Sequence, residues 1–350
     1  MIAENSEKTR PSSKTSRLLP WFNLVLSILL IALGIWYLAG KVSLKEVIQA
    51  ILLAKPGYVL LGVFIVLATL LVKAWRWQLM FMTSDDSLRL TPFFWASLLG
   101  QYVNLIVPFM RLGEIARIYA LNRQTDIAMA RSLGTLVVEK VLDLIMFTLT
   151  IAILLPLVIL PEIISEPGWI LWTLPFATLL VLYLLAYKTK LITRFFQAMA
   201  DKFPAQFGKR LLRWSISGLE GLASLRNHRL SLLLVASSAF IALLSLLLPF
   251  VLFLAFDLPL GLVAATLIHV AVTIAITPPS TPGKIGVFNG AVAFVLIYFG
   301  LADEAIIISY SIVFHLVAVL PQIVLGIIAA SRTNWRWQRS LEQQMTAGSG

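Results

Sequence analysis

Long apolar runs separated by short polar segments extend along almost the whole chain. Because a hydrocarbon layer about 30 Å thick is spanned by about 20 helical residues, each long run predicts a membrane helix. The runs of this length are residues 21–39, 58–75, 133–160, 169–187, 232–256 and 305–330. Two shorter runs, residues 260–276 and 285–299, lie next to prolines and glycines. The pattern predicts an all-α polytopic membrane protein with about eight transmembrane helices.

One apolar stretch, residues 93–108, does not fit this count. Gln101 and Asn104 interrupt it, and basic residues stand on both sides, Arg89 before it and Arg111 after it. We therefore expect a re-entrant element that enters the membrane and returns to the same face. Re-entrant backbone is tolerated only where protein or water satisfies its polar groups, so a cavity is expected beside it.

Composition and charge add an orientation to this picture. Hydrophobic residues make up 59% of the chain and charged residues 13%, against about 25% charged residues in soluble domains. The net charge of +11 is carried by residues 1–20, 188–229 and 331–350. By the positive-inside rule these segments are cytoplasmic, which predicts a multi-pass protein of the plasma (cytoplasmic) membrane with both termini inside. Since the basic charge flanks membrane helices, it indicates orientation and not nucleic-acid binding.

The domain organisation follows from the same boundaries. We expect a basic cytoplasmic tail (1–20), a single transmembrane domain (21–330) and a second cytoplasmic tail (331–350). Within the domain, residues 190–229 mix Phe and Trp with Lys and Arg. This composition favours amphipathic helices on the anionic lipids of the inner leaflet, and the alternative is a solvated loop with some helix.

Two details concern the ends of the second predicted helix. The first outer loop carries Lys41, Lys45 and Lys55 against Glu46, which is an exception to the positive-inside rule. The run Trp75-Arg76-Trp77 resembles an interfacial anchor, with indoles at headgroup depth and a snorkelling arginine.

Glu139 and Asp143 lie inside the apolar run 133–160. Four residues apart, they share one face of a helix, and an ionised group in the hydrocarbon costs at least a few kcal/mol unless it is paired. Two close carboxylates need a proton or cationic partners. Lys140 lies about 100° around the helix from Glu139, so Arg111 and Arg117 are the better candidates. Alternatively, the helix begins near Ala128 and only Asp143 is deep.

A second polar constellation runs from Asn104 through Pro108 to Arg117. On a helix after Pro108, the side chains of Arg111, Glu114 and Arg117 share one face. Two guanidinium groups flanking one carboxylate leave a positive site suited to phosphate, to which arginine donates two hydrogen bonds. The alternative is an ordinary cytoplasmic loop with a surface salt bridge.

The third constellation is the break between residues 277 and 290. Three prolines in six residues end a helix, and we expect a new one to start near Lys284. Gly283 and Gly286 permit close approach to the backbone, and a helix N-terminus with a lysine is suited to an anion. The alternative is a plain connecting turn. A Pro-interrupted apolar segment thus occurs in each half of the chain, at 93–111 and 260–299, which is typical of transporter sites.

These constellations, in this order, resemble the lysylphosphatidylglycerol synthase transmembrane-region family of flippase-like membrane proteins. The family pattern is Asn…Pro-x-Arg-x-Gly-Glu-x-x-Arg, then Glu-Arg-x-x-Asp, then Pro-Gly-Gly-x-Gly-x-x-Glu. This chain has the first from Asn104 to Arg117 and the second as Glu139-Lys140-Val-Leu-Asp143. The third is Pro282-Gly283-Lys284-Ile-Gly286-Val-Phe-Asn289, with Lys284 at a glycine and Asn289 at an acid. The resemblance covers residues 20–335.

The resemblance implies a translocase for a lipid or lipid-linked head group, a role that is not enzymatic. Its partners would be a membrane lipid or an anionic lipid-linked substrate. The implied substrate-binding residues are Asn104, Arg111, Glu114, Arg117, Glu139, Asp143, Gly283, Lys284, Gly286 and Asn289. The cations hold an anionic head group and the acids balance them. The chain ends without a soluble synthetase domain, so lipid aminoacylation is not expected.

No cofactor, catalytic residue or metal site is predicted. The chain has no cysteine and three scattered histidines. Of these, His269 and His315 lie in apolar stretches. Each is expected to be either a proton relay or a hydrogen-bonded structural residue. Two other functions stay open. One is a glycosyl- or phosphotransferase for a polyprenyl-phosphate lipid, although the acids Asp85-Asp86 fall on the predicted cytoplasmic side. The other is a non-transporting subunit of a lipid-synthesis complex.

Overall fold

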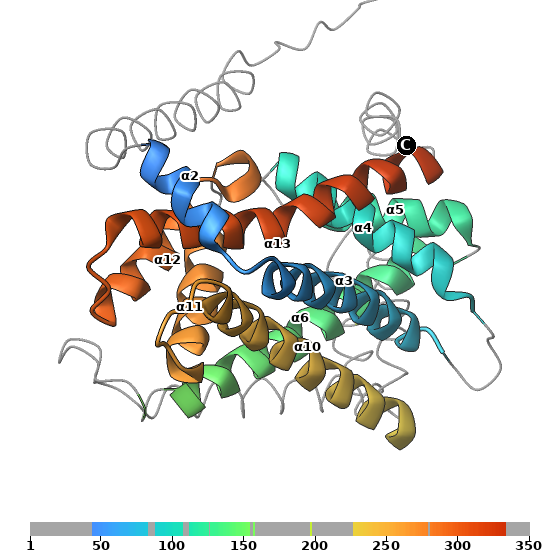
Figure 1. Cartoon of the computed structure of the whole chain (residues 1–350). Helices are drawn as coiled ribbons and strands as arrows, with labels where there is room; N and C mark the ends of the chain where they lie inside the picture. The colour runs from blue at the N-terminus through green and yellow to red at the C-terminus, as the bar shows by residue number, and fades with distance from the viewer. Residues whose placement is uncertain are drawn as a thin grey trace, which may run out of the picture.

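The computed structural model describes, in continuous stretches, residues 44–82, 88–107, 112–125, 127–154, 227–278 and 281–333. Every regular element in these stretches is a helix (Figure 1). The predicted spans 21–39 and 169–187, both tails, the segment 190–226 and the acids Asp85-Asp86 lie outside the described residues. The prediction of an all-α membrane protein is confirmed.

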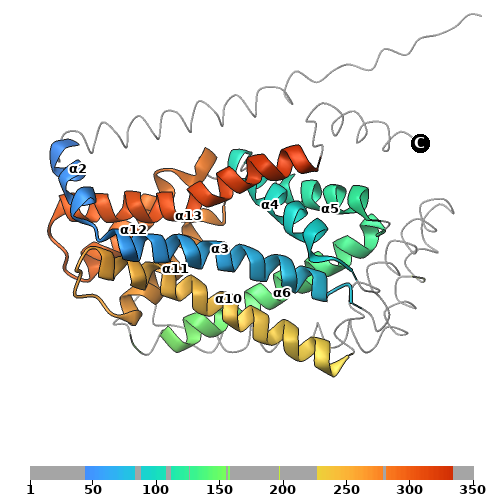
Figure 2. The ribbon, with the colours of Figure 1, turned by 45° about the vertical axis from the view of Figure 1, so that its right-hand side comes forward.

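Three helices are long and apolar enough to cross a membrane: α3 (Pro56–Leu79), α10 (His228–Ala255) and α13 (Glu304–Arg332). Helix α3 runs along α10 and also contacts α13 (Figure 2). Each agrees within a few residues with a predicted span. A fourth long helix, α6 (Met129–Leu154), begins where the alternative placed it, near Ala128.

Two helical hairpins pack against these long helices. The first joins α4 (Leu90–Ile106) to α5 (Leu112–Gln124), and the second joins α11 (Leu262–Ile276) to α12 (Val287–Tyr298). The prediction that residues 93–108 form the whole re-entrant element is therefore corrected, because α5 supplies the returning limb. Helix α5 can return alongside α4 because Gly113 approaches Gly100 closely. A Cβ on Gly113 would lie 1.9 Å from the Gly100 carbonyl oxygen.

The break in the second hairpin is one 3₁₀ turn, Pro282–Lys284 (η4), which packs on α4. Gly283, Lys284 and Gly286 all have positive φ angles, 67°, 60° and 83°. Because the chain leaves helical geometry after Lys284, α12 begins at Val287, three residues after the start that was predicted near Lys284. The tip of the second hairpin thus lies against the first.

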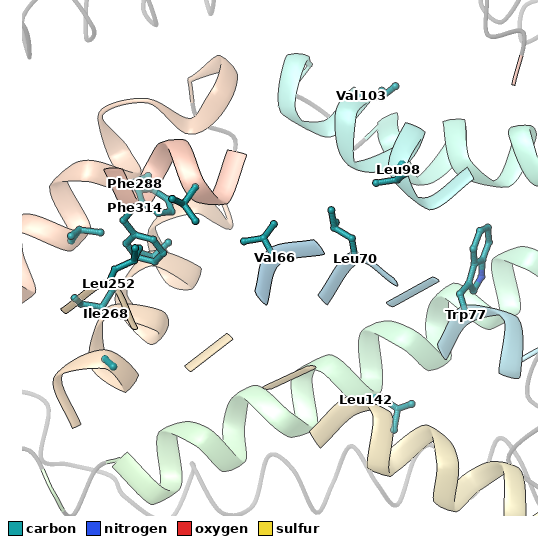
Figure 3. Packing of buried hydrophobic residues seen from close by; sticks show 14 of the residues in the cluster. Val66, Leu70, Trp77, Leu98, Val103, Leu142, Leu252, Ile268, Phe288 and Phe314 are labelled. Atoms are coloured by element: carbon teal, nitrogen blue, oxygen red, sulfur yellow. The ribbon is translucent and has the colours of Figure 1, made fainter. Parts of the chain in front are cut away.

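The core lies where the long helices and the hairpins meet. Figure 3 shows Val66, Leu70 and Trp77 spaced along α3, with Leu98 of α4 above Leu70 and with Phe288 and Phe314 beyond Val66. The opposite side of α3 exposes large apolar side chains such as Leu60 (69%) and Phe64 (66%). On a membrane helix these side chains contact lipid.

Lys55, one of the three lysines in the first outer loop that depart from the positive-inside rule, has an acidic partner. Its ammonium group pairs with Asp257 at 2.5 Å, and its backbone N–H donates to the Ala255 carbonyl at 2.9 Å. The hydrogen bond with Asp257 raises the pKa of Lys55 above its ordinary value. A cation is therefore retained between the start of α3 and the end of α10. The short helix before it, α2 (Leu44–Leu53), packs on α13.

Candidate functional site

The acids of α6 are each paired with an arginine from another helix. Arg117 of α5 donates from Nη1 to Oε1 of Glu139 at 3.3 Å and from Nη2 to Oε2. This is the bidentate geometry in which arginine binds a carboxylate most strongly. The expectation that Arg111 and Arg117, and not Lys140, counter the α6 acids is confirmed for Arg117 and Glu139. Both side chains are buried.

Arg117 is held in place by two further contacts. Its guanidinium carbon lies 4.3 Å from the centroid of the Trp77 ring, and the Trp77 indole donates to Thr135 Oγ1 at 3.1 Å. Glu114, one turn earlier on α5, lies 3.4 Å from Arg117 Nε. Lys140 pairs with the other oxygen of Glu114 at 2.9 Å. Glu114 and Arg117 share a face, as predicted.

Asp143 is paired with Arg76, which corrects the sequence-based interpretation of Trp75-Arg76-Trp77. Arg76 Nη2 lies 2.7 Å from Asp143 Oδ1, and Nη1 donates to Ser238 Oγ at 2.9 Å. Arg76 is 1% exposed and Trp77 is 0% exposed, whereas Trp75 is 37% exposed. Only Trp75 is available as an anchor. The arginine points inward because the α6 carboxylates provide its counter-charge.

Lys73 adds a further cation one turn before Arg76 on α3. It interacts electrostatically with Asp143 and Glu139. The arginine–carboxylate cluster, as we name this set, has four cations and three acids: Lys73, Arg76, Arg117, Lys140, Glu114, Glu139 and Asp143. Counted by formal charge over the described residues, its net charge is +1, and it joins α3, α5 and α6.

Asn104 has a structural role that the sequence did not indicate. Its Oδ1 accepts the Gly113 N–H at 2.8 Å, so the end of α4 caps the start of α5. This bond closes the first hairpin and sets the direction of the helix that carries Arg117. Arg111, predicted to act beside Arg117, lies outside the described residues.

The tip of the second hairpin makes a separate polar centre. Asn289 Oδ1 lies 3.2 Å from His315 Nδ1 and accepts the Gly286 N–H at 3.4 Å, while its amide donates to Ser311 Oγ at 3.4 Å. His315 also hydrogen-bonds the Gly283 backbone and interacts electrostatically with Lys284. We predicted that Lys284 and the α6 acids belong to one anion site. In the structure the turn that carries Lys284 packs on α4, and Asn289 of the same hairpin hydrogen-bonds Ser311 and His315 of α13.

The two intramembrane histidines lie in different surroundings. The ring of His269 on α11 is 6.5 Å from that of Phe147 on α6, and Lys73 is its electrostatic neighbour. His315 has the hydrogen bonds just described. Among the described residues, no group of three or more His, Asp or Glu side chains is placed to hold a metal ion.

Comparison with known proteins places this chain in a family. Residues 24–326 match the model of the lysylphosphatidylglycerol synthase TM region. The chain belongs to this family. It is also 30% identical over 124 residues to the UPF0104 membrane protein MJ1595 of Methanocaldococcus jannaschii. That match covers 35% of this chain and 37% of the archaeal protein. The protein is therefore an integral membrane protein of a family with lipid-related roles.

Two members of the cluster, Lys73 and Arg76, lie outside the three motifs that resemble the family pattern. Lys73 and Arg76 stand three residues apart in the apolar helix α3. Charged residues on one face of a membrane helix were the signal that singled out Glu139 and Asp143. Arg76 was misassigned because its tryptophan neighbours are typical of a membrane interface.

Proposed function

We propose that this protein moves a lipid, or a lipid-linked head group, between leaflets and holds an anionic head group at the arginine–carboxylate cluster. The observation that carries this proposal is the pair of arginine–carboxylate contacts, Arg117 with Glu139 and Arg76 with Asp143, inside a bundle of apolar helices. Charged groups within a membrane bundle are costly and mark substrate pathways. A merely structural role would be filled as well by apolar residues.

The charge balance favours an anion. With four cations and three acids, the cluster is neutralised by one additional negative charge. Among the described residues no acceptor faces the buried Nε of Arg76, so this guanidinium has a donor beyond those directed at Asp143 and Ser238. A phosphate diester supplies one charge and several acceptor oxygens, which match arginine donors.

Exchange of ion-pair partners gives a mechanism for release. The Asp143 side chain is 41% exposed while that of Arg76 is 1% exposed, so the acid is the accessible member of the pair. A phosphate that reaches Arg76 competes with Asp143 for the guanidinium group. When the head group leaves, Asp143 restores the pair and the empty cluster keeps its counter-charges. Arg76 then has a partner in both states, the phosphate when the head group is bound and Asp143 when the cluster is empty.

The location and partners belong to the same proposal. We place the protein in the plasma membrane with both termini in the cytoplasm, because its basic segments flank the membrane helices. Residues 190–229 would bind anionic lipids of the inner leaflet. The substrate would be a membrane lipid or lipid-linked anion.

Lipid movement in reconstituted vesicles tests the proposal. Purified protein is placed in phosphatidylcholine vesicles containing fluorescent phosphatidylglycerol, and loss of inner-leaflet probe is followed with an impermeant quencher. We expect Asp143→Asn to reduce the rate at least roughly tenfold, since Arg76 then lacks a restoring charge. Asp143→Glu should retain activity.

Asp257→Asn is the matched control, because it makes the same change in an exposed ion pair outside the membrane. It should move lipid at the wild-type rate. Unchanged movement in Asp143→Asn, with the wild-type protein active, would remove the proposed role of the cluster. Absence of movement in the wild-type protein would remove the proposed function.

A further inference from the structure

A groove of about 300 Å³ lies between α13 and the tip of the second hairpin. One stripe of α13 forms its longer wall, with the spacing of a single helix face: Ile312, His315, Leu316, Val319, Leu320 and Ile323. Gly283, Ile285 and Asn289 form the other wall. The groove is separate from the arginine–carboxylate cluster, and the mechanism above does not use it.

The dimensions of the groove fit one hydrocarbon chain. Ile312 and Ile323 are eleven residues apart, so the wall is about 17 Å long at 1.5 Å per residue. One leaflet contributes about 15 Å of a hydrocarbon layer about 30 Å thick. The volume lies at the lower end of the range of small-molecule sites, about 300–1,000 Å³, so a whole two-chain lipid is too large.

The groove opens toward the membrane. Leu316 is 52% exposed, Leu320 is 54% exposed and Ile285 is 48% exposed. These side chains belong to or face α13, a helix long and apolar enough to cross the bilayer. What reaches them from outside is therefore lipid hydrocarbon.

One end of the groove is polar. His315, hydrogen-bonded to Asn289 and to the Gly283 backbone, lies one helical turn from the Ile312 end, and the wall from Leu316 to Ile323 is apolar. A lipid has the same sequence of groups, because an ester and phosphate precede its chain.

Lys284 places a cation at the same end. It stands between the lining residues Gly283 and Ile285 and interacts electrostatically with His315. Its φ of 60° lies in the left-handed region, which costs a non-glycine residue about 1–2 kcal/mol. Backbone strain of this kind clusters at functional sites. A lysine at a position suited to glycine indicates that its charge is used.

We propose that the groove binds one hydrocarbon chain of a membrane lipid, with the ester and phosphate end of that lipid at Lys284 and His315. The inference deepens the proposed function and rests on it, because it assigns the tail of the same substrate. The two sites are linked through α4, which contacts η4 and, through Asn104, caps the helix that carries Arg117.

Photolabelling tests the groove independently of lipid movement. The full chain is reconstituted with phosphatidylglycerol that carries a diazirine near the end of one acyl chain, and labelled peptides are identified by mass spectrometry. We expect labels on α13 at Val319 to Ile323. Ile323→Trp fills the groove and should reduce this labelling roughly tenfold, equivalent to about 1.4 kcal/mol of binding. Ile323→Phe should have a smaller effect of the same sign.

Val324→Trp is the control, since Val324 is the next residue, is 49% exposed and does not line the groove. It should label like the wild type. Equal labelling in Ile323→Trp, Ile323→Phe and Val324→Trp would overturn the inference, because contact with bulk lipid alone gives that result. Labelling that depends on residue 323 in a protein that moves no lipid would retain the groove and reject the proposed function. Lipid movement together with labelling that does not depend on residue 323 would retain the proposed function and reject the groove.

Discussion

Arg76 Nη2 lies 2.7 Å from Asp143 Oδ1, and this ion pair joins the last turn of α3 to α6. Asp143 is the fifteenth of the 26 residues of α6, whereas Arg76 lies in the last turn of α3. Arg76 also lies 3.9 Å from Glu139, which Arg117 binds from α5. The two arginines therefore hold three helices together through two carboxylates.

This relationship predicts strong coupling between Arg76 and Asp143. Removing one partner of a fully buried ion pair costs about 3–5 kcal/mol, and exposed pairs contribute less than about 1 kcal/mol. Because the Asp143 side chain is 41% exposed, we expect Arg76→Gln to lose about 2 kcal/mol. Thermal unfolding in detergent measures the change.

The double variant Arg76→Gln/Asp143→Asn separates pairing from packing. It should be more stable than Arg76→Gln alone, since neither charge is left without a partner. Strictly additive losses would contradict the pairing, and no loss in Arg76→Gln would restore the interpretation of Arg76 as an interfacial anchor.

The first hairpin depends on the absence of a side chain at Gly113. A Cβ there would lie 1.9 Å from the Gly100 carbonyl oxygen and 2.5 Å from the Asn104 Cγ. We expect Gly113→Ala to lose roughly 1–3 kcal/mol, because the hairpin must open to admit the methyl group. It should also slow lipid movement, since α5 positions Arg117.

Gly290→Ala is the comparison for that variant. No heavy atom lies within 4 Å of a Cβ at Gly290, which is in α12. Helix propensity favours alanine there by about 1 kcal/mol, so the unfolding temperature should stay constant or rise. Equal destabilisation by the two substitutions would show that hairpin contact is not the cause.

Lys284→Gly should raise the stability of the protein and lower its rate of lipid movement. Glycine adopts the observed φ of 60° without steric cost, so we expect a gain of about 1 kcal/mol. If the cation holds a lipid phosphate at the groove, lipid movement should fall in the same variant. Greater stability with full activity would indicate that Lys284 is not used, and the two readouts are thermal unfolding and the vesicle assay.

The orientation of α13 can be tested with introduced cysteines, because the chain has none of its own. Ala302 and Ser331 are exposed and lie at the two ends of α13. An impermeant maleimide applied to intact cells should label Ala302→Cys, whereas Ser331→Cys should react only after permeabilisation. The opposite pattern would reverse the proposed orientation. Ser97 and Ser309 are buried and unsuitable for such labelling.

Long apolar runs identified the described membrane helices well, because lipid requires apolar side chains along the whole of each span. The predicted spans 58–75 and 305–330 lie within α3 and α13. The boundaries of α12 were harder to predict, since they depend on the positive φ angles of Lys284 and Gly286. Helix α5 was not predicted to be the second limb of the first hairpin, because its amphipathic sequence is typical of a helix beside a cytoplasmic loop.

The candidate site was predictable where charge stood out against an apolar background. Glu139 and Asp143 stood out in this way, and the pairing of Glu139 with Arg117 followed from the need for a counter-charge. The pairing of Arg76 with Asp143 depends on how α3 crosses α6, which single-helix patterns do not contain. The hydrogen bond of Asn289 with His315 likewise depends on the packing of α12 on α13.

The head-group preference of lipid movement tests the central claim most directly. Fluorescent phosphatidylglycerol and phosphatidylcholine with identical chains are compared in the same reconstituted vesicles, for the wild type and for Arg117→Gln. The cluster, with its one excess positive charge, predicts faster movement of the anionic lipid by the wild type and loss of that preference in Arg117→Gln. Equal rates for the two lipids in the wild type, or a preference that Arg117→Gln leaves unchanged, would contradict the account.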